Sequence, residues 1–572
     1  MTTSSKRSLW RALQDGIRLA RPYFGSSERA MARALFIGVI ALQLAMVGID
    51  VAINHWRGAF FEALQQRNGS EFMRQMWIYC GIGVGFVLVN TFQAYVTQWL
   101  SIRWRRWMSD GLAARWLDGP VHYRLQVMGD GPDNPDQRIA EDVRSFVRLA
   151  ISLTVGLIGA LVSLASFVFI LWELSAKAPL TSLGLSWDLP GYLVWAALAY
   201  AIVGTLITHF IGRPLIPLEV EQERREADYR YALVHVRDDG EAIALSRGEA
   251  WERAGLARRF DALMRNTFGL MRRQRSLSFF TMSYRHASLV FPYMIMSPLY
   301  FAGKMSLGVL MQAGSAFAHV RTALSYLITS YTTIAEAAAV IQRLTEFEAA
   351  IEHHRRNAPA ALPIAPAAAD GLSVRDLSVG APDRASPIAQ LDALRVQAGE
   401  QLLIVGAPGA GKTSVMRTVM GAWPLASGEA RSSFLRPWVV QRQSYLPLGS
   451  SLREGLLYPM DAAEVPLASS AAALEAVGLQ RLVEPLSTDA PWNEALSAGE
   501  RQRLGIARAL LVRPDVLWLD EAFSSLPVDE GRRLYELLRR ELPAMAIVTL
   551  DHEAPAWLSP TRVIPLAGAP AR

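Results

Sequence analysis

Long apolar runs alternate with charged segments over the first 330 residues of the chain. Six of these runs are long enough to cross the ~30 Å hydrocarbon core of a bilayer as helices. In chain order they cover residues 33–54, 76–100, 149–173, 191–212, 279–302 and 307–330. We therefore expect residues 1–352 to form an α-helical membrane domain with six spans.

The lysines and arginines are distributed unevenly among the segments between these runs. Three basic segments hold 7, 8 and 13 of them, whereas the three others hold 3, 1 and 1; the basic ones are residues 1–33, 103–148 and 213–276. Basic loops stay on the cytoplasmic side of a membrane. We expect both chain termini in the cytoplasm, and we assign the net charge of +6 to membrane flanks, with no nucleic-acid partner.

Residues 8–21 show a helical pattern of a different kind. Trp10, Leu13 and Ile17 recur on one face, and the other positions are mainly polar or small, which is typical of an amphipathic helix lying on membrane lipid. Pro22 is expected to end this helix. The chain has a single cysteine, Cys80, so an intramolecular disulfide is excluded.

The strongest chemical signal in the second half is an eight-residue stretch that fits the phosphate-loop pattern. It reads Gly406-Ala407-Pro408-Gly409-Ala410-Gly411-Lys412-Thr413. An apolar run at 402–405 predicts the preceding strand, and Ser414 continues into a helix-forming run that ends at Met420. Backbone N–H groups of such a loop surround phosphate oxygens, the lysine adds a positive charge, and the threonine hydroxyl can ligate Mg²⁺. We expect an ATP site.

Two further motifs follow in the order that ABC ATPases use. Leu496-Ser497-Ala498-Gly499-Glu500 resembles their signature sequence, and the apolar run at 516–519, followed by Asp520 and Glu521, resembles their Walker B strand. From the residues alone, Ser497 and Glu500 predict a capping box at the start of a helix. The resemblance implies an α/β P-loop ABC ATPase domain over residues 372–572.

This resemblance also implies a role for each matching residue. Asp520, Thr413 and Gln441 would hold Mg²⁺, Glu521 would be the general base, and His552 and Lys412 would contact the γ-phosphate. In ABC proteins the signature of one domain completes the ATP site of another. Because the chain carries one such domain, the resemblance implies a homodimer.

Three departures from the family pattern concern coupling and base recognition. Pro527 stands where an aspartate is usual, Asp551 precedes His552 in place of a small residue, and the segment 377–384 has no aromatic to stack on adenine. We expect hydrolysis nevertheless, because the catalytic lysine, aspartate, glutamate and histidine are all present.

Four stretches of the membrane half resemble the SbmA/BacA-like membrane proteins; they are residues 54–65, 102–107, 133–142 and 226–230. The overall arrangement is similar to the YddA-like branch, in which this domain is fused to an ATPase, and which is related to peroxisomal acyl-CoA half-transporters. The resemblance implies an ABC half-transporter with the exporter-type fold. It places the first coupling loop in 133–142 and the second in 237–249.

Two smaller features complete the organisation. Residues 353–371 are rich in alanine and proline, which predicts a semi-rigid, unpacked linker. Asp50, His319 and Arg321 fall within predicted spans, where ionisable side chains usually face a cavity, so they are candidate substrate-cavity residues.

The leading functional hypothesis is ATP-driven transport across the bacterial inner membrane. By resemblance, the solute is bulky and amphipathic or hydrophilic, peptide-like first and fatty-acyl second. Two alternatives stay open: an ATP-binding receptor or regulator with vestigial hydrolysis, and a proton-driven carrier that ATP modulates. The sequence does not separate import from export.

Overall fold

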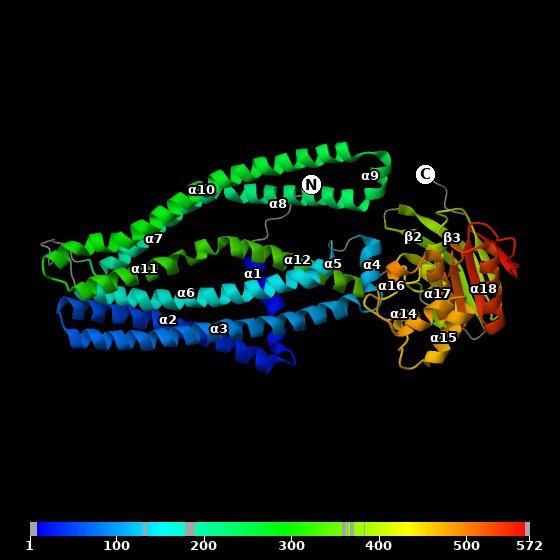
Figure 1. The fold of residues 1–572 in the computed structure, drawn as a ribbon, viewed down its shortest axis with the longest axis horizontal. Coiled ribbons are helices and arrows are strands. Elements are labelled where there is room, and N and C mark those ends of the chain that lie inside the picture. The colour runs from blue at the N-terminus through cyan, green and yellow to red at the C-terminus, as the bar shows by residue number, and fades with distance from the viewer. Residues whose placement is uncertain are drawn as a thin grey trace. The chain divides into compact units, whose positions relative to one another are not determined.

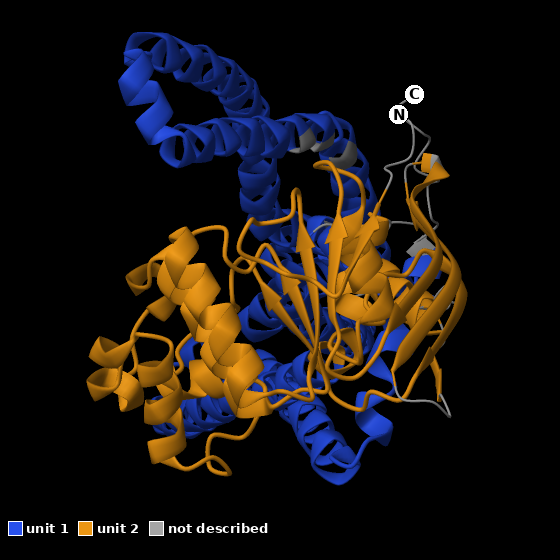
Figure 2. Cartoon of the chain, turned by 90° about the vertical axis from the view of Figure 1, so that its right-hand side faces the viewer, with its two compact units in different colours: residues 1–111, 134–345 blue, residues 112–133, 346–572 orange. Residues whose placement is uncertain are grey.

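The chain forms two compact units in a computed structural model, and Figure 2 shows them in different colours. The first unit comprises residues 1–111 and 134–345, and the second comprises residues 112–133 and 346–572. The structure describes residues 9–129, 134–177, 189–356, 362, 364–366, 371–382 and 384–566.

The first unit is helical throughout the part that the structure describes (Figure 1). Its long helices, some of which continue into the second unit, are α1 (Leu9–Ala20), α2 (Arg29–Gln65), α3 (Gly69–Trp116), α6 (Val143–Lys177), α7 (Tyr192–Gly212), α8 (Leu215–Asp238), α10 (Glu249–Phe301), α11 (Leu307–Thr329) and α12 (Tyr331–Arg356). Short helical segments join them: η1 (Tyr23–Gly25), α5 (Pro135–Gln137), η2 (Arg138–Asp142) and α9 (Gly240–Ser246). The helix predicted over residues 8–21 is observed as α1, which ends two residues before Pro22.

All six predicted spans fall on helices of this unit. Four segments among the described residues are long and apolar enough to cross a membrane, namely Arg29–Gln65, Gly69–Trp116, Pro135–Lys177 and Tyr192–Asp238. The remaining two predicted spans lie on α10 and α11. Pro292 and Pro298 stand inside α10, and polar residues dilute the apolar content of both helices.

The core of this unit lies where α11 packs against α2, α6 and α7. Phe167, Leu193, Met296 and Phe317 are fully buried there. Glycine permits the closest approach, because a Cβ on Gly308 of α11 would lie 2.3 Å from the Gly58 carbonyl oxygen of α2. These helices therefore pack as one bundle, as a membrane domain requires.

The second unit contains two β-sheets. One has the order β1 (Ile364–Pro366), β5 (Ala426–Ser432), β2 (Leu372–Ala381), β3 (Arg384–Val396). The other is entirely parallel, with the order β6 (Pro437–Gln441), β7 (Val516–Asp520), β8 (Ala546–Asp551), β4 (Gln401–Val405), β9 (Arg562–Pro565). The helices are α4 (Val121–Met128), α13 (Lys412–Val419), α14 (Leu452–Leu457), α15 (Leu467–Ala476), α16 (Trp492–Ala495), α17 (Ala498–Val512) and α18 (Val528–Glu541).

The parallel sheet is covered on both faces, which explains why its strands are apolar runs without alternation. Leu403 and Leu517 belong to the hydrophobic cluster on one face. Ile404 and Trp518, their neighbours in sequence, belong to the cluster on the other. The sequence-predicted strands at 402–405 and 516–519 are confirmed as β4 and β7.

The structure describes parts of two segments that the sequence predicts to be connections. Residues 134–142, predicted as the first coupling loop, belong to the first unit, whereas α4 belongs to the ATPase unit, where Tyr123 and Val127 pack against its core; Asp133 lies outside the described residues. Within the predicted linker, residues 353–356 form the end of α12, Leu362 is buried, and β1 pairs with β5 although all three residues of β1 are exposed. The rest of Pro359–Ala369 lies outside the described residues.

Candidate functional site

The predicted site residues meet at one edge of the parallel sheet. Gln441 is the last residue of β6, Asp520 is the last of β7, and His552 directly follows β8. The phosphate loop, residues 406–413, follows β4. Because these four strands are parallel neighbours, their carboxyl ends lie side by side, where open α/β sheets bind ligands.

The phosphate loop depends on two glycines with left-handed backbone conformations. Gly409 has φ of 80° and Gly411 has φ of 87°. A Cβ on Gly411 would also lie 2.8 Å from the Cβ of Ala389. The loop leads directly into α13, so backbone N–H groups and the positive end of the helix dipole face the space a phosphate would occupy.

Lys412 is held inside this loop. Lys412 is only 7% exposed. Its Nζ donates hydrogen bonds to the carbonyl oxygens of Gly406 at 2.6 Å and Ala407 at 3.1 Å. The same Nζ lies 3.2 Å from Nδ1 of His552. The ammonium group is therefore already positioned at the loop before phosphate oxygens reach it.

Asp520 and Thr413 form the second part of the site. The Thr413 hydroxyl donates to Asp520 Oδ1 at 3.1 Å. Burial raises the pKa of Asp520, and the nearby charge of Glu521 raises it further, although the hydrogen bond from Thr413 opposes both effects. Gln441 pairs in register with Asp520 across β6 and β7. Hydroxyl, carboxylate and amide oxygens are ligands that suit Mg²⁺, so these residues fit that ion.

Glu521, which directly follows Asp520, has an unusual backbone conformation. Its φ of 48° is rare for a residue with a side chain and costs local strain, as is common at functional sites. Its carboxylate lies 3.1 Å from Nε2 of His552 and 3.9 Å from Arg442. The Asp551 carboxylate accepts a hydrogen bond from the His552 backbone N–H at 2.7 Å, so the unusual aspartate helps to fix the histidine.

The predicted signature residues form the start of α17. Ser497 and Glu500 make the capping box that the sequence predicted, and Leu496 is buried in the core. Burial would raise the pKa of Glu500, but hydrogen bonds from Arg481 and Ser497 outweigh it and lower that pKa. A Cβ on Gly499 would lie 3.3 Å from the Ser525 carbonyl oxygen, so Ala498-Gly499 packs against the loop after β7.

Gln502 is a site residue that the sequence analysis missed. It is fully buried on α17 and donates to the Ser524 hydroxyl at 3.1 Å and to the carbonyl oxygens of Arg442 and Glu521 at 3.4 Å each. The side-chain oxygen Oε1 of Gln502 accepts a hydrogen bond from the Ser525 N–H at 3.0 Å. It thereby ties together the loops that follow β6 and β7. A glutamine on the otherwise apolar face of a helix was the only sequence signal.

The candidate substrate-cavity residues do not form one group. Asp50 of α2 and His319 of α11 interact electrostatically, and the His319 ring stacks on Phe167 with a centroid distance of 4.0 Å. Arg321 instead acts electrostatically on Tyr200 and Tyr284. The pair and the arginine are thus separate features of the membrane unit.

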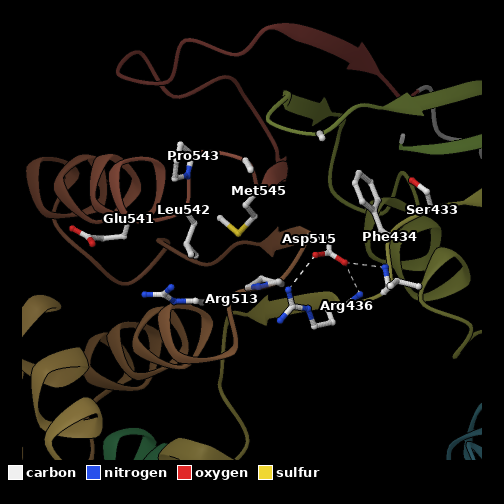
Figure 3. Close-up of a pocket in the computed structure, with 13 residues that line it drawn as sticks. Ser433, Phe434, Arg436, Arg513, Asp515, Glu541, Leu542, Pro543 and Met545 are labelled. Carbon is white, nitrogen blue, oxygen red and sulfur yellow. Dashed lines mark hydrogen bonds and ion pairs between the residues drawn. The ribbon is translucent and has the colours of Figure 1, made fainter. Parts of the chain in front are cut away.

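A cavity of about 500 Å³ lies at the opposite edge of the parallel sheet (Figure 3). Arg436, Asp515 and Met545, which line it, directly precede β6, β7 and β8. The Asp515 carboxylate accepts hydrogen bonds from the backbone N–H groups of Leu435 and Arg436. Because it borders the amino ends of the strands, this cavity is distinct from the nucleotide site.

Comparisons with known proteins cover both units. Residues 19–301 match the family described as ABC transporter transmembrane region 2, and residues 391–524 match the family described as ABC transporter. The chain is 34% identical to the inner membrane ABC transporter ATP-binding protein YddA of Escherichia coli (strain K12), over 94% of this chain and 95% of that protein. It is 29% identical to the chloroplastic ABC transporter D family member 2 of Arabidopsis thaliana, over 96% of this chain and 85% of that protein.

A solved structure shares the fold of the whole chain. The structure of a bacterial Atm1-family ABC exporter with ATP bound superposes with a TM-score of 0.69 at 19% identity, covering 94% of each chain. The predicted combination of an exporter-type helical membrane domain and an α/β ABC ATPase domain is thereby confirmed.

Proposed function

This chain belongs to the ABC transporters, which couple ATP hydrolysis to transport, and from that premise we propose that two copies move a polar, peptide-like solute across the bacterial inner membrane. The name of the Escherichia coli relative supports the inner membrane. The concentration of Lys and Arg in residues 1–33, 103–148 and 213–276 supports a cytoplasmic location for both termini and the ATPase domain.

The contacts of His552 carry the proposal of ATP hydrolysis at this site. The ring lies between Lys412 and Glu521, at 3.2 Å and 3.1 Å. Lys412 and the loop N–H groups would bind the outer phosphates, and Glu521 would accept a proton from the attacking water. Mg²⁺, held by Thr413, Asp520 and Gln441, would supply positive charge to the phosphate oxygens.

A homodimer follows from the distribution of the motifs. The chain has one phosphate loop and one signature. Within the chain, Ser497 and Glu500 bond to each other, and the Glu500 carboxylate also accepts a hydrogen bond from Arg481. The start of α17 has backbone N–H groups suited to an anion. In the proposed dimer this helix end faces the ATP on the partner subunit, so that each ATP lies between two copies.

A polar face on α3 carries the proposal of a polar solute. Asn90, Gln93, Thr97, Gln98 and Ser101 recur at helical spacing and line a groove of about 520 Å³. On α6, Arg148 and Ser152 line its other side. Amide and hydroxyl groups in a membrane-spanning helix are costly against lipid, so this face is suited to a water-filled path and to hydrogen bonding with a solute. A fatty-acyl substrate would favour an apolar lining.

The test uses purified protein in lipid nanodiscs and measures ATP hydrolysis with and without short peptides. We expect peptides to stimulate the wild type, and Gln98→Leu to lose that stimulation while keeping its basal rate. Phe92→Leu, an exposed position on α3 outside the polar face, is the matched control. Stimulation by fatty-acyl compounds alone, or equal peptide stimulation in Gln98→Leu, would reject the proposed solute class.

A further inference from the structure

An apolar cavity of about 280 Å³ lies beneath α1 in the membrane unit. One face of α1 lines it with Leu13, Gly16, Ile17 and Ala20. The other walls come from η1, α2, α3, α6 and α12 and are mainly aromatic or aliphatic; they include Phe36, Trp104, Phe146, Ile151 and Ile341. Its volume is just below the range of ligand sites, which span roughly 300–1,000 Å³.

The cavity is bounded on one side by side chains that also face outwards. Leu13 and Ile17 line it and are nevertheless 53% and 58% exposed, and Trp10 on the same side of α1 is 66% exposed. Apolar side chains of this size on an amphipathic helix lie in the boundary between headgroups and acyl chains. In a bilayer this would place the rim of the cavity at the depth where acyl chains begin.

The opposite face of α1 and the chain that follows it are basic. Residues 9–33 contain five arginines, namely Arg11, Arg18, Arg21, Arg29 and Arg33, against Asp15 and Glu28, which gives a net charge of +3. All five arginines are exposed. Exposed basic residues of this kind are attracted to an anionic lipid surface.

We propose that this cavity binds one acyl chain of an anionic membrane phospholipid. The apolar walls hold the chain, and the exposed arginines of residues 9–33 attract its headgroup. This combination of an apolar cavity and adjacent positive charge favours a phospholipid over a neutral apolar solute. The inference depends on the first unit being a membrane domain, and it is independent of the proposed solute and of ATP hydrolysis.

The bound chain would act on the helix that leads to the ATPase. Ala337 and Ile341 of α12 form part of the cavity wall, and α12 continues to Arg356. The contact between α1 and α12 is already close, because a Cβ on Gly16 would lie 3.0 Å from Ile341 Cδ1. An acyl chain in the cavity would fill the remaining space between α1, α6 and α12 and stabilise their packing.

The test is native mass spectrometry of the full chain purified from nanodiscs that contain equal amounts of phosphatidylglycerol and phosphatidylethanolamine. We expect the wild type to retain one tightly bound phosphatidylglycerol per chain. Ala150→Phe, which places a ring in the cavity, is expected to lose it, whereas Ala165→Phe, at an exposed position of α6, is expected to keep it. Replacing Arg11 and Arg18 by glutamine should lower the preference for phosphatidylglycerol at least threefold.

Equal lipid retention by wild type and Ala150→Phe would overturn the proposal, as would retention of phosphatidylethanolamine in equal amount by the wild type. If Ala150→Phe does not fold, photo-crosslinking of wild type with a phosphatidylglycerol that carries a diazirine on one acyl chain decides the question. Adducts on residues 13–20 or 146–154 support the site. Adducts confined to other segments reject it.

Discussion

The Nε2 atom of His552 lies 3.1 Å from the Oε1 atom of Glu521. The other ring nitrogen, Nδ1, lies 3.2 Å from the ammonium of Lys412, which can only donate. Nδ1 must therefore accept, and the ring proton of a neutral histidine is placed on Nε2, where it can donate to the carboxylate. The general base is thus positioned by a histidine whose own tautomer is set by the phosphate-loop lysine.

Glu521→Gln is expected to lower ATP turnover by a factor of about 10²–10⁴, because the amide keeps the shape of the side chain but cannot accept the proton. Nucleotide binding should persist, so the variant should accumulate as an ATP-bound dimer. Hydrolysis and bound nucleotide per chain are measured in nanodiscs. Glu553→Gln, at an exposed carboxylate directly after His552, is the control. Turnover within tenfold of wild type would remove Glu521 from the role of base.

Gln502→Leu should destabilise the ATPase unit and slow hydrolysis together. The substitution leaves the Ser525 N–H without its 3.0 Å partner and costs about 1–3 kcal/mol. It also frees the loops after β6 and β7, which position Glu521. Thermal unfolding midpoints and ATPase rates are compared with those of Gln480→Leu, an exposed glutamine. If both variants unfold at the same temperature, Gln502 has no anchoring role.

Much of the ATPase unit could be predicted from sequence because its signals are local. The buried strands β4, β7 and β8 are continuous apolar runs, and the capping box at Ser497 needs only four consecutive residues. Parallel packing then places the ends of neighbouring strands at one edge, which brings Lys412, Asp520 and His552 together. Local patterns and one topological rule were sufficient to bring these three residues together, whereas their roles came from the family resemblance and the anchoring by Gln502 was not predicted.

Features that depend on distant pairs were not predictable in the same way. The packing of α4 against the ATPase core joins Tyr123 to strands about 250 residues later, and no local pattern marks that contact. The Asp142 carboxylate meets Arg343 across 201 residues, and Asp50 interacts with His319 on another helix. Each of these pairs involves residue types that are common on helix surfaces, so their partners emerge only from the three-dimensional packing.

Asp142→Asn should loosen the packing of η2 against α12. The carboxylate is 6% exposed and accepts two hydrogen bonds from Arg343, at 2.6 Å and 2.9 Å, and one from Arg138 at 2.8 Å. Breaking a buried pair from one side costs up to about 3–5 kcal/mol, and the partial exposure of Arg343 reduces this. We expect a lower melting temperature in nanodiscs.

A double-mutant comparison separates the ion pair from general damage. If the pair acts as a unit, Asp142→Asn combined with Arg343→Gln should lower the melting temperature by less than the sum of the two single effects. Arg74→Gln, whose partner Glu71 is on an exposed helix turn, should have little effect. Strictly additive losses at positions 142 and 343 would show that the two side chains are not coupled.

Asp520→Asn is expected to stabilise the nucleotide-free protein while abolishing hydrolysis. Because burial raises the pKa of Asp520, the folded domain binds this proton more tightly than the unfolded chain does. The carboxyl group therefore contributes stability only at low pH, and that contribution is lost as the pH rises from about 3.9 through the raised folded value. At pH 7 the charged carboxylate is a net destabilising group, and asparagine removes it.

We expect a higher melting temperature without nucleotide for Asp520→Asn, no further increase with Mg²⁺ and ATP, and a shrinking difference from wild type as the pH is lowered. Asp392→Asn, at an exposed position of β3, should change neither value. A nucleotide-free melting temperature below that of wild type at pH 7 would mean that the hydrogen bond from Thr413 outweighs the burial of the charge.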